Sequence, residues 1–147
     1  MRARLLVAAA TVAVVVPVTA MASSAMMSPV VSAKLLGKNE VPKGSATGSG
    51  LAVVHLDAAK GTVCWTFAKV VKIGKPLAAH IHKAKPGASG PIVVPFGGAY
   101  KAKGCTKASK TVITAIEEHP GSYYVNIHTA KYPAGAIRGQ LVVGMHG

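Results

Sequence analysis

The stretch LAAHIHKAKPGASGPIVVPF, residues 77–96, decides the fold because it holds two strand-like runs separated by a turn-rich segment. Successive side chains of an extended strand point to opposite faces, so His80 and His82 share one face while Ala79 and Ile81 share the other. The Pro, Gly and Ser residues that follow predict a turn. The apolar run that closes the stretch predicts a short strand, and its proline indicates a sheet edge or a strand end.

Runs of the same kind recur along the chain. They are rich in β-branched and aromatic residues, which strands prefer, and they cover residues 32–36, 51–57, 62–71, 122–129 and 136–143. Residues 37–50 and 97–110 are expected to be loops, while residues 111–118 fit a strand or a short helix equally well. About eight short strands predict an all-β fold, either an antiparallel β-sandwich or a Greek-key-like barrel. Trp65, the only Trp, is expected in its core.

The chain begins with a segment that has the parts of a secretory signal peptide. Residues 1–4 carry two arginines, residues 5–16 are apolar, and small residues follow Pro17. A membrane anchor is the alternative, but the apolar run is shorter than the ~20 residues that cross a bilayer. We therefore expect residues 1–25 to be a signal peptide, and we expect no membrane span once it is removed.

The rest of the chain is long enough for one domain. We expect an unstructured lead-in at residues 26–32, one β domain at residues 33–143 and a tail at residues 144–147. No internal repeat and no long amphipathic helical pattern divides the domain further.

The chain has two cysteines, Cys64 and Cys105. In the oxidising environment outside the cell a lone pair most often forms a disulfide, and two buried free thiols are the alternative. A bridge would close a loop of about 40 residues and stabilise the fold by ~3–4 kcal/mol in the chain-entropy model. We expect the disulfide, because export favours it.

The charge is strongly positive, since 17 Lys and Arg residues stand against 4 Asp and Glu residues, a net of +13. Without Arg2 and Arg4 the net is +11. A lysine-rich surface keeps a secreted protein soluble, and it also suits weak attraction to anionic polymers of the cell envelope. Nucleic acid is not an expected partner, because Arg138 is the single Arg after the leader and nucleic-acid recognition relies on Arg. Another extracellular protein stays open as a partner.

Three of the six histidines carry a chemical hypothesis. His80 and His82 share one face of their strand, and His128 shares a face of the penultimate strand with Tyr124 and Asn126. If the two strands are neighbours, the imidazoles come within metal-ligating reach. Imidazole suits Cu(II), Zn(II) and Ni(II), and three ligands leave one position open. The sequence thus predicts a candidate copper or zinc site at His80, His82 and His128, supported by Asn126 or Tyr124.

The same histidines have a purely structural alternative. They would then hydrogen-bond to one another, to Asn126 and Thr129, or to loop backbone, and so fix the turn at residues 87–90. The sequence favours this alternative, because exposed H-x-H pairs are common and no carboxylate that could orient the imidazoles lies close in the sequence.

No arrangement typical of an enzyme is apparent. A Ser–His–Asp triad would need Asp57, the only Asp, and the sequence holds no G-x-S-x-G elbow. Glu117 and Glu118 are adjacent, so on a strand their side chains would point to opposite faces and could not act together on a sugar. Arg138 is expected to serve the scaffold by pairing with one of these glutamates, with an anionic ligand as the alternative. We expect no enzyme activity.

Several segments, taken in order, resemble the chordin-type (CHRD) domain. They are NEVP at 39–42, AHIH at 79–82, GPIVV at 90–94, YVNIHT at 124–129 and GAIRGQL at 135–141. The resemblance includes Asn126 and Arg138 as signature positions and covers about residues 33–143. It implies an extracellular β-sandwich or barrel module of a family whose molecular function is largely undefined. The heavy lysine content departs from that pattern.

The H-x-H strand is also similar, more loosely, to the copper-ligand strand of Cu/Zn superoxide dismutases. Their bridging histidine and zinc-loop ligands are not apparent here, so the likeness does not extend to a dismutase. The function expected from the sequence is a secreted, non-enzymatic binding or structural module at or outside the cell envelope. The alternative is a copper- or zinc-binding protein that uses His80, His82 and His128.

Overall fold

Nine strands and one α-helix follow one another within residues 29–144, the part of the chain that the computed structural model describes. The strands are β1 (Val30–Leu36), β2 (Ser49–Asp57), β3 (Thr62–Val71), β4 (Pro76–Lys83), β5 (Ile92–Pro95), β6 (Lys103–Lys107), β7 (Tyr123–Thr129), β8 (Ile137–Gln140) and β9 (Val142–Val143). The helices are α1 (Lys110–Glu118) and two short 3-10 turns, η1 (Gly37–Asn39) and η2 (Pro120–Ser122). The predicted signal peptide at residues 1–25 lies outside the described residues.

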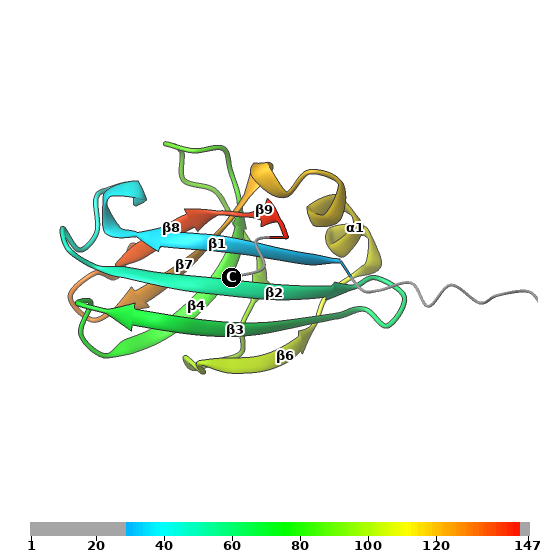
Figure 1. The fold of residues 1–147 in the computed structure, drawn as a ribbon, viewed down its shortest axis with the longest axis horizontal. Coiled ribbons are helices and arrows are strands. Elements are labelled where there is room, and N and C mark those ends of the chain that lie inside the picture. The colour runs from blue at the N-terminus through cyan, green and yellow to red at the C-terminus, as the bar shows by residue number, and fades with distance from the viewer. Residues whose placement is uncertain (1–28, 145–147) are drawn as a thin grey trace, which may run out of the picture.

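The strands form one antiparallel sheet in the order β5-β4-β7-β8-β1-β2-β3-β6, and β9 pairs with β1. Figure 1 shows β1, β2, β3 and β6 as a front layer, with β4 and β7 behind them. Residues 96–102 link the two ends of this order, because the Tyr100 N–H donates to Leu77 O on β4 and the Phe67 N–H of β3 donates to Ala102 O. The sheet is a nearly closed barrel, which confirms the predicted all-β antiparallel fold.

Aromatic rings fill the space between the two layers. The Trp65 ring of β3 stacks on Phe96, which follows β5, with ring centroids 4.5 Å apart. Trp65 is buried, as expected, and its indole N–H donates to Lys101 O at 2.9 Å, so its one polar atom is paired. Strand β5 lies at one end of the strand order, as its proline indicated.

Residues 97–110 are not only a loop, which corrects the prediction. They contain β6, which pairs with β3 and places Cys105 directly opposite Cys64. The two cysteines form the predicted disulfide. Strand β6 has the sequence KGCTK and lacks the alternating apolar residues of a typical strand. It is therefore held by its pairing with β3 and by the disulfide, and not by the burial of an apolar face.

Residues 111–118, which fit two structures in the sequence, lie in the helix α1. The Ser109 hydroxyl caps its first turn, accepting from the Val112 N–H at 3.2 Å. Ile113 and Ile116 lie three residues apart on one helix face and are fully buried. A capped start and one buried apolar face decide in favour of the helix.

The first and last strands differ from the predicted ones. β1 begins at Val30, inside the lead-in of residues 26–32 that was expected to be unstructured, because Val30 already pairs with His55. The predicted last strand, residues 136–143, is divided into β8 and β9, and buried Leu141 separates them. Within residues 29–144 no helix has the length and apolar character needed to cross a bilayer.

Candidate metal centre

Strands β4 and β7 are neighbours in the sheet, which the metal hypothesis required. Their antiparallel register sets His80 opposite Asn126, His82 opposite Tyr124 and Ala78 opposite His128. Directly opposed residues share a face of the sheet, so these side chains gather on one side. The alternate residues of both strands, such as Ile81 and Val125, are fully buried in the core.

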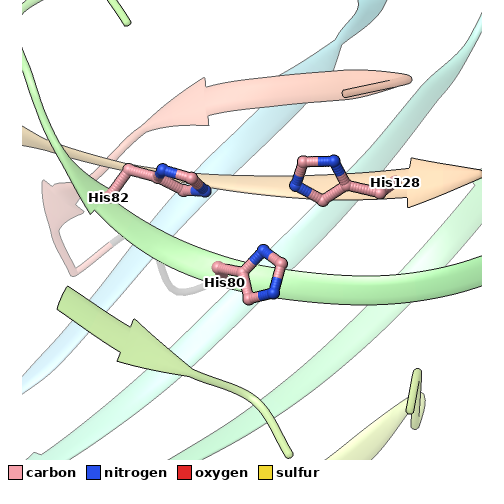
Figure 2. A group of neighbouring side chains, drawn as sticks. All are labelled: His80, His82 and His128. Atoms are coloured by element: carbon pink, nitrogen blue, oxygen red, sulfur yellow. The ribbon is translucent and has the colours of Figure 1, made fainter. Parts of the chain in front are cut away.

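Figure 2 shows the His80, His82 and His128 rings facing a common space, two from β4 and one from β7. The ring centroids lie 4.9 Å apart for His80 and His128, 5.5 Å for His80 and His82, and 6.1 Å for His82 and His128. One nitrogen of each ring can be chosen so that the three atoms all lie within 4.8 Å of one another. The structure thus brings the three predicted ligands together in a group that could hold a metal ion.

The hydrogen bonds of His82 identify which of its nitrogens is free. Its Nδ1 lies 2.9 Å from Gly90 O, and because a carbonyl only accepts, Nδ1 carries the proton of the neutral ring. Its Nε2 is therefore the lone-pair atom. This Nε2 and the Nδ1 of His80 are buried, and neither has a hydrogen-bond partner among the described residues.

His128 is held at both ring nitrogens. Its Nδ1 lies 2.9 Å from Pro133 O, and its Nε2 lies 3.0 Å from Asn126 Oδ1. Both neighbours are acceptors, and a neutral imidazole can donate to only one of them. When Nδ1 carries the proton, it donates to Pro133 O, and the lone pair is then on Nε2. Nε2 is the ring nitrogen that faces the other two histidines.

The protonation of the cluster suits metal binding, which requires neutral imidazole. Burial lowers the pKa of His80 to about 4, and the neighbouring His128 and His82 rings contribute to the same shift. Burial also lowers the pKa of His82, although the bond to Gly90 O acts in the opposite direction. Both rings are therefore neutral near pH 7, with no proton to displace.

Tyr124 and Asn126, the two predicted supporting residues, both contact the cluster. The Tyr124 ring stacks on His82, with centroids 4.8 Å apart and planes 6° from parallel. Asn126 reaches His128 through its Oδ1 and is 1% exposed. These contacts fix the orientation of two of the three imidazoles.

Glu40 is a buried carboxyl that sequence reasoning missed. It is 4% exposed, and its Oε1 has no hydrogen-bond partner among the described residues. Burial raises the pKa of Glu40 to about 7, opposed by the charge of Arg138 and by hydrogen bonds from Asn126 and the Val41 backbone. Asn126 therefore connects Glu40 to His128. The one feature of the sequence that could have identified Glu40 is its place in the NEVP segment, which resembles the CHRD domain.

Arg138 serves the scaffold, but its predicted pairing with Glu117 or Glu118 is wrong. It is 1% exposed, and its guanidinium donates to Ala88 O at 2.7 Å and to Lys85 O at 3.0 Å. These carbonyls belong to the loop between β4 and β5, which also supplies Gly90 O to His82. Arg138 therefore fastens the loop that orients one candidate ligand.

The other histidines do not join this cluster. His55 is exposed on β2, and His119 ends α1. His146 lies outside the described residues.

Comparisons with curated proteins and with solved structures gave no match. The family model of the CHRD domain matches residues 31–141, which include all three clustered histidines, Asn126 and Arg138. This match covers most of the chain, so the protein belongs to the CHRD domain family.

Proposed function

We propose that this protein is a secreted, non-enzymatic module that binds one copper or zinc ion through His80, His82 and His128. The observation that carries the proposal is the convergence of three ring nitrogens within 4.8 Å of one another, with two buried ring nitrogens of the cluster lacking a partner. Buried polar atoms in proteins are nearly always hydrogen-bonded, so two such atoms in one cluster call for a ligand.

The hydrogen bonds assign the ligand atoms. His80 offers Nδ1 and His82 offers Nε2, because these are the atoms without partners. His128 offers Nε2, with its Nδ1–H donated to Pro133 O, and the ion replaces the contact with Asn126 Oδ1. Backbone carbonyls that accept from the second nitrogen of a ligating imidazole are the usual way in which proteins orient such ligands. The histidines can therefore hydrogen-bond to loop backbone, as the structural alternative expects, and bind a metal ion at the same time.

The donor set favours copper or zinc. Three neutral imidazoles without a thiolate suit Cu(II) and Zn(II), whereas Mg²⁺ and Ca²⁺ prefer oxygen ligands. A fourth position remains for water or a small ligand.

A non-enzymatic role is supported by the positions of three of the four carboxylates, Asp57, Glu117 and Glu118. Asp57, the only Asp, is engaged by Lys60 through an ion pair of 3.1 Å and a backbone hydrogen bond. Glu117 and Glu118 lie on α1 and do not belong to the histidine group. Export is supported by the signal-like N-terminus and by the disulfide between Cys64 and Cys105.

Calorimetric titration with Cu(II) and Zn(II) at pH 7, combined with elemental analysis, tests the proposal. The wild-type protein should bind one equivalent of at least one of the two ions with micromolar or tighter affinity. His80→Ala and His128→Ala should each weaken that binding at least 100-fold. His55→Ala is the matched control, because it removes an exposed imidazole outside the cluster, and it should leave the affinity unchanged. Equal losses in His55→Ala and His80→Ala, or no binding by the wild type, would contradict the proposal.

A further inference from the structure

A second concave surface lies at the end of the barrel opposite α1. There β3 and β7 finish while β2 and β4 begin (Figure 1). The cleft has a volume of about 600 Å³ and is formed by three loops and the start of β4. Ser45, Lys72, Lys75, Leu77, Lys131 and Tyr132 are among its lining residues.

The charge of this cleft is uniformly positive. Lys72, Lys75 and Lys131 line it, and no Asp or Glu does. All three lysines are exposed. Clefts lined by charge of one sign concentrate ligands of the opposite sign.

The acidic side chains of the described residues do not neutralise it. Asp57 is paired with Lys60, and Glu40 is buried. Glu117 and Glu118 belong to α1, at the other end of the barrel (Figure 1). Among residues 29–144 no carboxylate forms an ion pair with the three cleft lysines.

Apolar and aromatic surface lies among these charges. Leu77 is 47% exposed although it lies near the start of a strand, and the Tyr132 ring is half-buried. The Lys131 ammonium lies 5.5 Å from the Tyr132 ring centroid. A charge and an aromatic face therefore occur side by side, in the range of a cation–π contact. A ligand that carries both anionic groups and apolar ring faces would match this combination.

Hydrogen bonds set the shape of the cleft before any ligand arrives. The Ser45 hydroxyl donates to Lys72 O at 2.7 Å and so joins two of the lining loops. The Tyr132 N–H donates to Thr129 O at 3.1 Å, which closes the third loop. Lys72 itself adopts a backbone φ of 58°. This left-handed conformation turns the loop sharply after β3. A preformed cleft loses less entropy on binding than a mobile surface does.

We propose that this cleft binds a segment of an acidic saccharide chain, with Lys72, Lys75 and Lys131 paired with its carboxylates. Its volume lies in the ~300–1,000 Å³ range of small-ligand sites. Sugar rings have apolar faces that can pack on Leu77 and Tyr132, which a free phosphate cannot do. A nucleic acid fits less well, because no arginine lines the cleft. The proposed site shares no lining residue with the proposed metal site.

The test is calorimetric binding of tetragalacturonate, with the neutral tetrasaccharide maltotetraose as comparison, in buffer with EDTA so that bound metal plays no part. The key variant carries Lys72→Gln, Lys75→Gln and Lys131→Gln. The matched control carries Lys101→Gln, Lys103→Gln and Lys110→Gln, which removes the same charge from exposed positions outside the cleft. Anionic phosphatidylglycerol vesicles form the third arm.

The expected result is wild-type binding of tetragalacturonate at least tenfold tighter than maltotetraose, weakening as NaCl rises from about 50 to about 300 mM. The cleft variant should lose at least tenfold in affinity and the control variant less than threefold. Equal losses in the two variants would overturn the proposal and leave only diffuse surface charge. It would also be overturned by binding to vesicles without binding to the saccharide, or by equal affinity for both saccharides.

Discussion

The guanidinium carbon of Arg138 lies 3.4 Å from the centroid of the Tyr124 ring, so a buried cation rests on an aromatic face. The same Tyr124 ring stacks on His82. Arg138 also donates to carbonyls of the loop whose Gly90 orients His82. One side chain thus supports a candidate metal ligand from two directions.

Arg138→Lys should destabilise the metal-free protein by about 2–4 kcal/mol, because lysine keeps the charge but loses the planar fork that donates to Ala88 and Lys85 and stacks on Tyr124. Urea denaturation measures the change. Lys103→Arg, an exchange at an exposed position of β6, is the control. Its stability should stay within about 0.5 kcal/mol of wild type, as is usual for surface exchanges. If Arg138→Lys also changed the stability by no more than about 0.5 kcal/mol, the guanidinium of Arg138 would not be needed to stabilise the fold.

Gly90→Ala should weaken metal binding about 10–100-fold and also destabilise the fold by about 1–3 kcal/mol. A Cβ at this position would collide with Lys83 O and displace the carbonyl that accepts from His82. Gly98→Ala is the matched control, because a Cβ there would have no atom within 4 Å. Calorimetric titration of both variants with Cu(II) and Zn(II) measures the change. Equal metal affinities of Gly90→Ala and Gly98→Ala would contradict a role for the Gly90 carbonyl in metal binding.

The sequence predicted which residues share a face, but not which strands pair. The two-residue period of β4 separates His80 and His82 from Ala79 and Ile81, and any strand of this sequence would do the same. Bringing His128 within reach depended on β7 lying next to β4 rather than elsewhere in the sheet. That choice is made by the packing of the whole barrel, which no local pattern encodes.

Other features left too little signal in the sequence. Strand β6 was predicted as loop because KGCTK has no apolar alternation, and the partner strand and disulfide that stabilise it are distant in the chain. The two loop acceptors of Arg138, Ala88 O and Lys85 O, are backbone carbonyls, which every residue has, so residue types could not identify them. Glu40 meets Asn126 only through the fold, and local sequence gave no reason to connect them.

Glu40→Gln should stabilise the protein increasingly as the pH rises. The folded-state pKa of Glu40 is about 7, against an ordinary value of 4.5. The stability from the protonated carboxyl is therefore complete below pH 4.5 and is lost as the pH rises to 7. The loss amounts to roughly 3 kcal/mol for wild type. Because glutamine stays neutral, the variant should gain about that much relative to wild type between pH 4.5 and 7.5. Urea denaturation of the metal-free proteins at both pH values measures it, and a pH-independent difference would contradict the buried-carboxyl assignment.

The double variant Cys64→Ala, Cys105→Ala should lose about 4 kcal/mol of stability, since the bridge constrains the unfolded chain by closing a long loop. The two cysteines have a sequence separation of 41. The loss should be accompanied by faster amide exchange in β6, which the bridge ties to β3. Denaturation and hydrogen exchange of the oxidised wild type and the double variant provide the comparison. A loss below about 1 kcal/mol would mean that strand pairing alone holds β6.

Crystals of the protein soaked with Cu(II) or Zn(II), with an anomalous difference map at the metal edge, test the metal assignment most directly. The predicted result is a single strong peak about 2.0–2.1 Å from His80 Nδ1, His82 Nε2 and His128 Nε2. His82 and His128 should keep their contacts with Gly90 O and Pro133 O. A peak at His55 or His119, or no peak between the three rings, would contradict the assignment and leave the cluster as a structural brace.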